Sequence, residues 1–455
     1  MRIKSVGLIV AGVVSQTWSV FSQQSRPNIV YVFTDQQTAL AMSCAGNTDL
    51  ITPNMDRLAK EGIRFENAYC NAPLSVPSRA TMFTGVMPTE SGAKGNGDEL
   101  KEKYKNRTLG NILTGSGYEC AYGGKWHLHE NDINSKYGFR NIHNFGDLGL
   151  ADSCVAFLKE KHSKPFFLVA SFDNPHNICE YARSQELPWA TVKEPELDKC
   201  PNLPSNFHPA PYEAEMVRVA QRNPYSFKLY PTVNYSNDEW RRYRNAYYRL
   251  VEHVDAEIGK IVDAILSSNL EKNTIIIFSS DHGDGNGSHQ WNQKSALFEE
   301  IVNIPFIVRL PGLKNQGKVA TQIINNGTDL FATICDLSAT KLPEYCSGKS
   351  IRPIVEGKET KEIHDYVVAE TQFDGEPAAI GWMIRTPKFK YVVYAQGKYR
   401  EQLFDINADR GEQVNLAVEA RYREVLNQHR KLLFEWVKAN KAVSLNPNRL
   451  IPAVN

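Results

Sequence analysis

Ser75 stands four residues before Arg79, in a segment that predicts both the start of a helix and a reactive side chain. Pro77 fixes its own φ at a value that suits the first helical turn. A helix that begins there directs backbone N–H groups and its positive dipole end toward the group that Ser75 carries, which favours an anion at this place. Serine is also a preferred N-cap, so a catalytic nucleophile and an ordinary helix cap both remain open.

Polar side chains follow two apolar runs, residues 28–34 and 274–280, which have the length and the β-branched and aromatic content of buried strands. The side chains in question are Asp35, Gln36, Asp281 and His282. Open α/β sheets bind ligands at the carboxyl ends of parallel strands, so these groups are expected to converge. Oxygen ligands suit a hard divalent cation. One Asp after a strand is more often a turn or cap, but two such strand ends together with Ser75 favour a metal site.

Basic side chains recur at positions that would face the same edge of the sheet. They are Arg79, Lys125, His127, His176 and Lys294. Lys125 and His127 are two residues apart, so in an extended stretch both project from one side. His176 follows a third predicted strand, residues 165–171, and Lys294 follows a short Gly-rich loop. A lone His or Lys at such a place is more often a surface or capping group. The ordered set indicates an anionic substrate.

The segment from Ser75 to Gly85 resembles the modification motif of the type I, formylglycine-dependent sulfatases of the alkaline-phosphatase-like superfamily. In that motif the first Cys or Ser is converted to Cα-formylglycine (3-oxoalanine). The resemblance covers most of the chain and implies a serine-type member, whose Ser75 is modified by a serine-type formylglycine-generating maturation enzyme. It also implies one divalent metal ion; of the hard cations Ca²⁺ and Mg²⁺, which both suit oxygen ligands, we expect Ca²⁺.

The resemblance further implies a role for each candidate residue. The metal ligands would be Asp35, Gln36, the modified Ser75, Asp281 and His282. Arg79 and Lys125 would steady the modified residue and the sulfate, and His127 would hold the formylglycine hydrate. His176 and Lys294 would contact the sulfate and the leaving-group oxygen.

Two positions depart from the commonest pattern of the family. Gln36 stands where a second Asp is usual, and His282 stands where Asn is usual. The metal site would then keep two carboxylates, and imidazole is an unusual partner for Ca²⁺ because hard cations prefer oxygen. Zinc is the rival ion, although no further His or Cys has the spacing of a zinc cage.

The elements that must position these residues predict an α/β fold: a large, mostly parallel sheet sandwiched by helices, with a smaller C-terminal domain of antiparallel sheet plus helix. Residues 52–62 and a long helix opened by a Ser236–Glu239 capping box are the clearest helices. The C-terminal domain would use short strands at 366–370, 382–385 and 390–394 and a helix at 425–436. We divide the chain into residues 1–22, 23–360 (catalytic domain) and 361–455. Residues 179–234, rich in Pro, are expected to form an insertion over the active-site edge.

Residues 1–22 resemble a secretory signal peptide, with a basic start and an apolar stretch from Val6 to Val14. That stretch is too short to cross a bilayer, so we expect an exported protein, periplasmic or secreted, without a membrane span. Removal of 1–22 would leave 50 basic against 51 acidic residues, which gives no support for nucleic-acid binding. Export permits disulfides among the eight cysteines; Cys179–Cys200 and Cys335–Cys346 are possible pairs.

The predicted substrate is a sulfated carbohydrate, a glycan or glycosaminoglycan O-sulfate. Trp291 could stack on a sugar ring, with ordinary loop packing as the alternative. Asn96, Asp98 and His129 are polar groups on loops expected to border the pocket. The competing hypotheses are a phosphomonoester or phosphonate hydrolase of the same superfamily and a non-catalytic glycan-binding relative whose Ser75 is never oxidised. The full set of basic residues weighs against the last of these.

Overall fold

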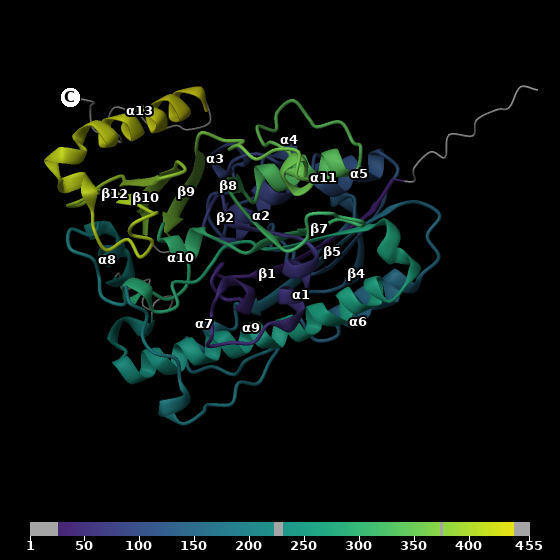
Figure 1. The fold of residues 1–455 in the computed structure, drawn as a ribbon, viewed down its shortest axis with the longest axis horizontal. Coiled ribbons are helices and arrows are strands. Elements are labelled where there is room, and N and C mark those ends of the chain that lie inside the picture. The colour runs from purple at the N-terminus through teal and green to yellow at the C-terminus, as the bar shows by residue number, and fades with distance from the viewer. Residues whose placement is uncertain (1–25, 223–230, 374–375, 441–455) are drawn as a thin grey trace, which may run out of the picture.

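The computed structural model of the protein describes residues 26–222, 231–373 and 376–440. The predicted signal peptide lies outside the described residues. Two sheets and their covering helices form the part of the chain that the structure describes (Figure 1). Within it, no helix combines the length and the apolar character needed to cross a membrane.

The larger sheet has eight strands in the order β4-β3-β5-β1-β6-β7-β2-β8. The strands are β1 (Asn28–Asp35), β2 (Ile63–Tyr69), β3 (Glu119–Gly124), β4 (Arg140–His143), β5 (Phe166–Pro175), β6 (Thr274–Ser280), β7 (Phe306–Arg309) and β8 (Lys318–Asn325). All neighbouring pairs are parallel except those of β7, which runs antiparallel to β6 and to β2. The mostly parallel sheet predicted from the sequence is confirmed.

Helices cover both faces of this sheet, and the alternation of side chains in β1 explains why. Ile29, Tyr31 and Phe33 belong to the same apolar cluster as helix α2 (Ser75–Thr84), whereas Val30 and Val32 belong to the cluster built on helix α9 (Asn237–Leu266). Successive strand residues point to opposite faces, and both sets are fully buried, so each face needs its own layer of helices. Figure 1 shows α9 with α1 (Pro53–Glu61) and α6 (Leu150–Lys159) along one side of the sheet and α2 with α11 (Thr328–Leu337) along the other.

The helices have these bounds: α1 (Pro53–Glu61), α2 (Ser75–Thr84), α3 (Pro88–Ser91), α4 (Glu102–Lys105), α5 (Leu109–Gly115), α6 (Leu150–Lys159), α7 (Ile178–Ala182), α8 (Glu215–Arg222), α9 (Asn237–Leu266), α10 (Glu299–Val302), α11 (Thr328–Leu337), α12 (Arg352–Val355) and α13 (Arg423–Ala439). The predicted capping box is present: Ser236 Oγ accepts from the Glu239 N–H, and the Glu239 carboxylate accepts from the Ser236 N–H. Thr52 occupies the N-cap position of α1, but its hydroxyl contacts Ser43 and Asp56 instead of making a cap bond.

The C-terminal part forms a four-stranded antiparallel sheet in the order β12-β11-β10-β9. Its strands are β9 (Val367–Phe373), β10 (Glu376–Arg385), β11 (Phe389–Tyr394) and β12 (Glu401–Asp405). One apolar cluster joins this sheet to α13 and contains Trp382, Tyr391 and Leu433. The predicted antiparallel sheet and covering helix are confirmed. The boundary at residue 360 stays a prediction.

Three expectations are corrected in detail. Strand β5 continues to Pro175, so Asp173 and Asn174 lie within the strand and not after it. The segment 179–234 includes all but the first residue of helix α7 and the whole of helix α8, where the sequence showed little periodicity. All eight cysteines lie among the described residues and are free, so neither suggested disulfide is formed.

Candidate active site and metal centre

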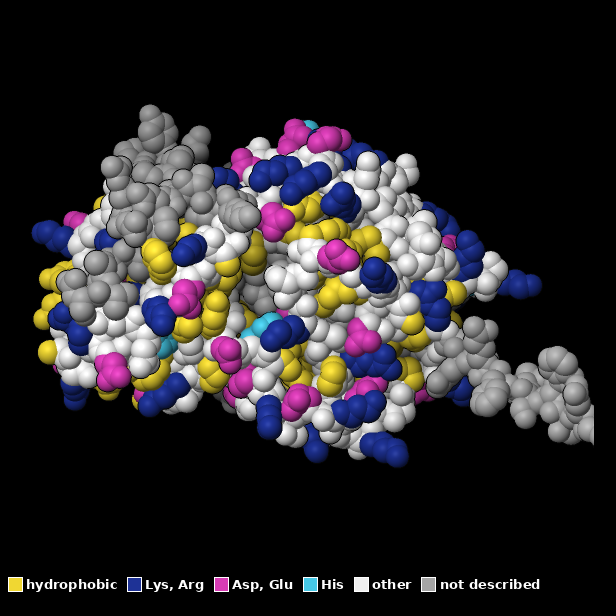
Figure 2. Space-filling model, turned by 90° about the horizontal axis from the view of Figure 1, so that it is seen from above, with side chains coloured by type: hydrophobic (Ala, Val, Ile, Leu, Met, Phe, Trp, Pro, Cys, Tyr) yellow, Lys and Arg dark blue, Asp and Glu magenta, His cyan; other side chains and the backbone are white. Residues whose placement is uncertain are grey.

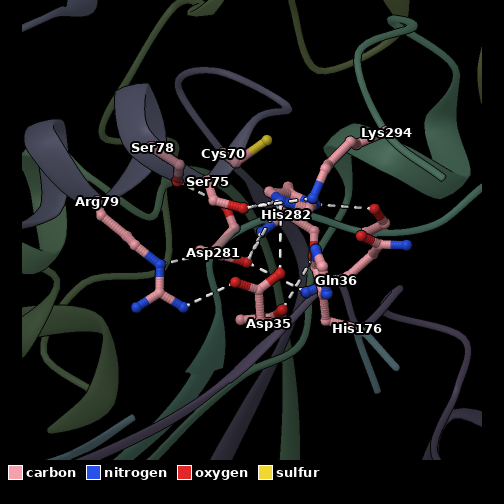
Figure 3. A network of polar contacts seen from close by, with 12 residues as sticks. Asp35, Gln36, Cys70, Ser75, Ser78, Arg79, His176, Asp281, His282 and Lys294 are labelled. Carbon is pink, nitrogen blue, oxygen red and sulfur yellow. Dashed lines mark hydrogen bonds and ion pairs between the residues drawn. The ribbon is translucent and has the colours of Figure 1, made fainter. Parts of the chain in front are cut away.

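The metal-site carboxylates come together because β1 and β6 are adjacent parallel strands. Thr34 pairs with Ser280, so the next residue of each strand, Asp35 and Asp281, emerges at the same edge of the sheet. Asp35, Asp281 and His282 each offer a ligand atom, and these atoms lie within 4.8 Å of one another. All three residues are fully buried. The sequence-predicted pairing of the two strand ends therefore produces one cluster, which Figure 3 shows in detail.

Ser75 is the first residue of α2 and points at this cluster (Figure 3). Its Oγ lies 3.1 Å from His282 Nε2 and 3.5 Å from Lys294 Nζ. The neighbouring turn is fixed to β6 because Ser78 Oγ donates to the Asp281 carbonyl at 2.6 Å. Helix α2 thus begins where its backbone N–H groups face the metal-ligand cluster.

The residues present fit a divalent cation. Asp35 Oδ1 is buried without a hydrogen-bond partner among the described residues, and it lies 3.7 Å from His282 Nε2. His282 Nδ1 lies 3.0 Å from the Gly283 carbonyl, so Nδ1 carries the hydrogen and the Nε2 lone pair faces the cluster. Burial lowers the pKa of His282, which keeps this imidazole neutral and able to bind a metal. An orphaned carboxylate oxygen beside a neutral imidazole is the environment that a cation would complete.

Gln36 is held by a residue that the sequence analysis missed. Its side-chain amide donates to Asp284 Oδ2 at 2.7 Å, and Asp284 also accepts from the Tyr243 hydroxyl at 3.1 Å. Burial raises the pKa of Asp284 to about 6. The amide nitrogen of Gln36 is thereby oriented by Asp284. Its carbonyl oxygen, which lies 3.7 Å from Cys179 Sγ, is the atom that a cation could engage. Only the spacing Asp281-His282-Gly283-Asp284 could have drawn attention to this carboxylate.

Arg79 donates hydrogen bonds to both metal-site carboxylates. Nη2 donates to Asp35 Oδ2 and Nε to Asp281 Oδ2, both at 2.9 Å. Nη1 donates to the Lys125 carbonyl at 2.5 Å and to Ser171 Oγ at 2.9 Å. The side chain is fully buried, and despite the opposing effect of desolvation the two carboxylates raise its pKa. Arg79 therefore fixes the two aspartates, and it does not line the cavity described below.

Lys125 follows β3 and bridges two carboxylates. Its Nζ lies 2.8 Å from Asp35 Oδ2 and 2.9 Å from Asp173 Oδ1. Desolvation opposes the charge on Lys125, but Asp173 and Asp35 outweigh it and raise the pKa. Asp173 was not selected from the sequence. It also accepts from Asn177 Nδ2 at 3.0 Å and from Trp189 Nε1 at 2.9 Å.

Two histidines stand beside Lys125. His127 has a positive φ of 57°, and its buried Nδ1 has no hydrogen-bond partner among the described residues. Burial, together with the charges of Lys125 and Arg79, lowers its pKa to about 3. His176 follows β5, whose Pro175 pairs with Asp35, and this register brings His176 to the site. Burial lowers the pKa of His176 too, although its side chain retains 21 % exposure.

These residues line a cavity of about 380 Å³. Its walls are Asn96, Lys125, His127, Asn131, Phe145, Asp173, His176, Asn177, Glu180, Arg183, Pro188, Trp189, Gln293 and Lys294. The volume lies in the range of small-molecule sites. Residues of the segment 179–234 form part of the cavity wall. This agrees with the expectation that the segment lies over the active-site edge. On the face shown in Figure 2, basic and acidic side chains of the described residues are interspersed.

The four candidate substrate-binding residues differ in whether they line the cavity. Trp291 is fully buried, packs against Phe298 and Phe373, and donates Nε1–H to the Lys294 carbonyl at 3.1 Å. A buried indole offers no face to a sugar, so the stacking hypothesis is wrong and the packing alternative is correct. Asn96 lines the cavity, and its Oδ1 accepts from the Val76 N–H at 3.2 Å, which holds the start of α2.

The other two candidates do not line the cavity. Asp98 accepts from the N–H groups of Lys94 and Gly95, both at 2.9 Å, and so closes a turn. His129 retains 54 % side-chain exposure, with Nδ1 3.2 Å from Glu99 Oε1. Both residues lie on loops that contribute other residues, Asn96 and His127, to the cavity lining. The side chains of Asp98 and His129 themselves are not part of that lining.

A buried serine at a helix N-terminus, two strand-end carboxylates that could hold a divalent cation and an adjacent row of basic residues fit an ester hydrolase on an α/β sheet. Comparison with known families agrees. The sulfatase family model matches residues 27–340, and the model of the N-sulphoglucosamine sulphohydrolase C-terminal region matches residues 287–439. The chain belongs to the sulfatase family.

Individual relatives align over nearly the whole chain. A Delta 4,5-hexuronate-2-O-sulfatase of Bacteroides thetaiotaomicron is 31% identical, over 96% of this chain and 92% of the relative. The solved structure of a 2-O GAG sulfatase has a TM-score of 0.81 at 29% identity, with 93% of this chain and 94% of that chain covered. A phosphonate monoester hydrolase of Agrobacterium radiobacter shares the fold at 22% identity, with a TM-score of 0.76 and coverage of 91% and 96%.

Proposed function

We propose that this sulfatase hydrolyses O-sulfate esters of carbohydrates, after export, through a formylglycine made from Ser75. The observation that carries the proposal is the position of Ser75 Oγ, 3.1 Å from His282 Nε2 and 3.5 Å from Lys294 Nζ. A nucleophile at that point would touch both the cation site and the cationic wall of the cavity. The two relatives named as carbohydrate sulfatases support a sugar as the leaving group. Export rests on residues 1–22 alone.

Each group at the site has a chemical task in this proposal. Calcium, held by Asp35, Gln36, Asp281 and His282 beside the modified Ser75, would neutralise sulfate charge and lower the proton affinity of the attacking hydroxyl. The aldehyde made from Ser75 would supply a hydrate with two hydroxyls, one to attack sulfur and one to expel sulfate, which an unmodified serine lacks.

The protein residues bind the sulfate and move protons. Lys125 and Lys294 direct their ammonium groups at the non-bridging oxygens and the leaving group, where charge develops as the S–O bond breaks. His127, neutral because its pKa lies far below neutrality, can accept the proton whose removal releases sulfate. His176 lines the same cavity, and a ring N–H of its imidazole can donate a hydrogen bond to the leaving-group oxygen. Arg79 keeps both aspartates in place.

The modification of Ser75 can be measured directly. We expect the peptide that contains Ser75 to be lighter than its sequence requires by about two mass units when the protein is made beside a serine-type maturation enzyme, because two hydrogens are lost. Peptide mass spectrometry measures this difference. The same peptide from a host without that enzyme is the control. An unshifted mass in a fully active preparation would contradict the proposed nucleophile.

The phosphonate hydrolase fold keeps one competing function open, a phosphomonoester or phosphonate hydrolase. Charge alone does not separate sulfate from phosphate, but the proposed release of sulfate from a Ser75 hydrate, assisted by His127, does. We expect sulfated sugars to exceed their phosphorylated analogues in kcat/KM by at least about a hundredfold, or roughly 2.7 kcal/mol of transition-state binding. A panel of hexuronate, hexosamine and aryl sulfates against the matching phosphates measures it. Equal or better turnover of phosphate would transfer the assignment to the competing function.

A further inference from the structure

Trp189 lines the cavity, and the proposed sulfate chemistry gives it no task. It belongs to the segment 179–234, next to Pro188, which lines the same cavity. Its side chain is half-buried, whereas Trp291 is fully buried. The indole of Trp189 therefore presents apolar surface that a ligand can cover. The inference that follows rests on the proposed function, because it concerns the sugar whose sulfate that site would remove.

Contacts on several sides hold the Trp189 indole in one orientation. Its Nε1–H donates to Asp173 Oδ2 at 2.9 Å, and the Trp189 backbone N–H donates to Asn177 Oδ1 at 3.3 Å. The Phe145 ring meets the indole edge-on, with ring centroids 5.7 Å apart. A Cβ added at Gly146 would lie 2.9 Å from the indole, so the backbone there is in close contact with it. A wall that is already fixed loses little conformational freedom when a ligand covers it.

One carboxylate connects this indole to the sulfate end of the cavity. Asp173 Oδ1 lies 2.9 Å from Lys125 Nζ, while Asp173 Oδ2 accepts from Trp189. Lys125 Nζ in turn lies 2.8 Å from Asp35 Oδ2, at the candidate metal site. Because the ion pair and the indole hydrogen bond share one short side chain, Asp173 sets the separation between the indole and the ammonium group that would bind sulfate.

Asp147 holds Asp173 in turn. The Asp173 N–H donates to Asp147 Oδ1 at 2.6 Å, and the backbone N–H and side-chain amide of Asn174 donate to Asp147 Oδ2, both at 2.9 Å. Segment 145–147 therefore packs against the indole and also fixes the end of β5 that carries Asp173. A buried network satisfied in this way is rigid.

We propose that Trp189 is the surface on which the sugar ring of the substrate packs, and that Asp173 is a positioning residue that holds this indole at a fixed place relative to Lys125. A pyranose ring carries C–H groups on its faces and hydroxyls at its rim. A C–H face gains dispersion contacts and buries apolar area against an indole, while the sulfate reaches Lys125 and Lys294. The ligand class is a sulfated cyclic sugar.

The test separates the sugar ring from the sulfate. We expect Trp189→Ala to raise KM for hexuronate and hexosamine sulfates by at least about tenfold, with kcat changed less than about threefold, because ring packing is made in the ground state and the transition state alike. Inorganic sulfate as a competitive inhibitor reaches only the sulfate end, so its Ki should stay within about threefold. Trp189→Phe should lose less, since it keeps an aromatic ring. The same substitutions at half-buried Trp436, on α13 and outside this cavity, are the matched control.

A double-mutant cycle tests the role of Asp173. Asp173→Ala also disturbs Lys125, so the quantity to follow is the ratio of the sugar-sulfate KM to the sulfate Ki, in which the shared effect on the sulfate end cancels. We expect Asp173→Ala to raise this ratio at least about threefold, but less than about 1.5-fold where Trp189→Phe has already removed the Nε1–H donor. Asp173→Asn should recover part of the rise, because its amide oxygen still accepts from the indole. Equal rises in the two backgrounds would overturn the role of Asp173.

An unchanged KM in Trp189→Ala, or equal losses for sugar sulfates and inorganic sulfate, would overturn the role of Trp189. Binding gives a readout that needs no turnover. Unsulfated methyl glycosides of the same sugars should change the tryptophan fluorescence of the wild type and of Trp436→Phe, but not that of Trp189→Phe; a change that persists in Trp189→Phe would contradict the packing surface. If no sulfate ester at all is hydrolysed, the proposed function fails, while this fluorescence comparison still decides the role of Trp189.

Discussion

Ser75→Ala is expected to abolish desulfation, with a loss of at least about 1,000-fold in kcat, or roughly 4 kcal/mol of transition-state stabilisation. The substitution removes the Ser75 hydroxyl, so residue 75 can no longer be oxidised to an aldehyde. It leaves α2 otherwise intact, and the lost contact to His282 Nε2 at 3.1 Å is worth about 1 kcal/mol of stability. Steady-state kinetics on the sulfate panel, together with thermal unfolding, separates the two effects.

Ser75→Cys provides the matched control for that loss. In the family pattern either Ser or Cys at this position can be oxidised, each by its own type of maturation enzyme. We therefore expect Ser75→Cys to be active in a host with a cysteine-type enzyme, and the wild type to be folded but inactive there. Residual turnover by Ser75→Ala within about tenfold of wild type would refute the nucleophile. Full wild-type activity without any maturation enzyme would mean that Ser75 acts unmodified.

Loss of the metal is the second large effect. We expect a chelator to remove activity and Ca²⁺ to restore it, because Asp35 and Asp281 supply hard oxygen ligands at the edge of the sheet. Asp281→Ala should lose both turnover and calcium binding, measured by calorimetry. The variant should also be less stable, since Arg79 Nε would lose its 2.9 Å contact with Asp281 inside the protein.

Asp281→Asn separates these two consequences. The amide keeps the shape of the side chain but supplies one neutral oxygen, so metal affinity should fall while packing is retained. A chelated enzyme with full activity would contradict the metal-dependent reading. Restoration by Zn²⁺ and not by Ca²⁺ would make His282 the dominant ligand and overturn the choice of a hard cation.

The helices and strands of the fold could be predicted because each of them depends on a local pattern of apolar and polar residues. The apolar run 28–34 has the composition of a strand buried on both faces, and the structure packs its alternate residues against two different helical layers. The capping box at Ser236 depends on four consecutive residues and formed as expected. Strand order was beyond such patterns, because pairing joins residues far apart in the chain, as the antiparallel β7 between β6 and β2 illustrates.

The sequence by itself determined the chemical inventory at the sheet edge: an acid after each of two buried strands, a serine at a helix start and a row of basic residues. These positions follow from element ends, and element ends are local. Only the tertiary structure decided the partners and directions of side chains. In the structure Asp173 forms an ion pair with Lys125, and the Trp291 side chain is buried. Trp189 and Arg183 line the cavity. The physical reason is that a loop side chain points wherever packing and hydrogen bonds from distant segments hold it, and no periodicity in its own segment encodes those contacts.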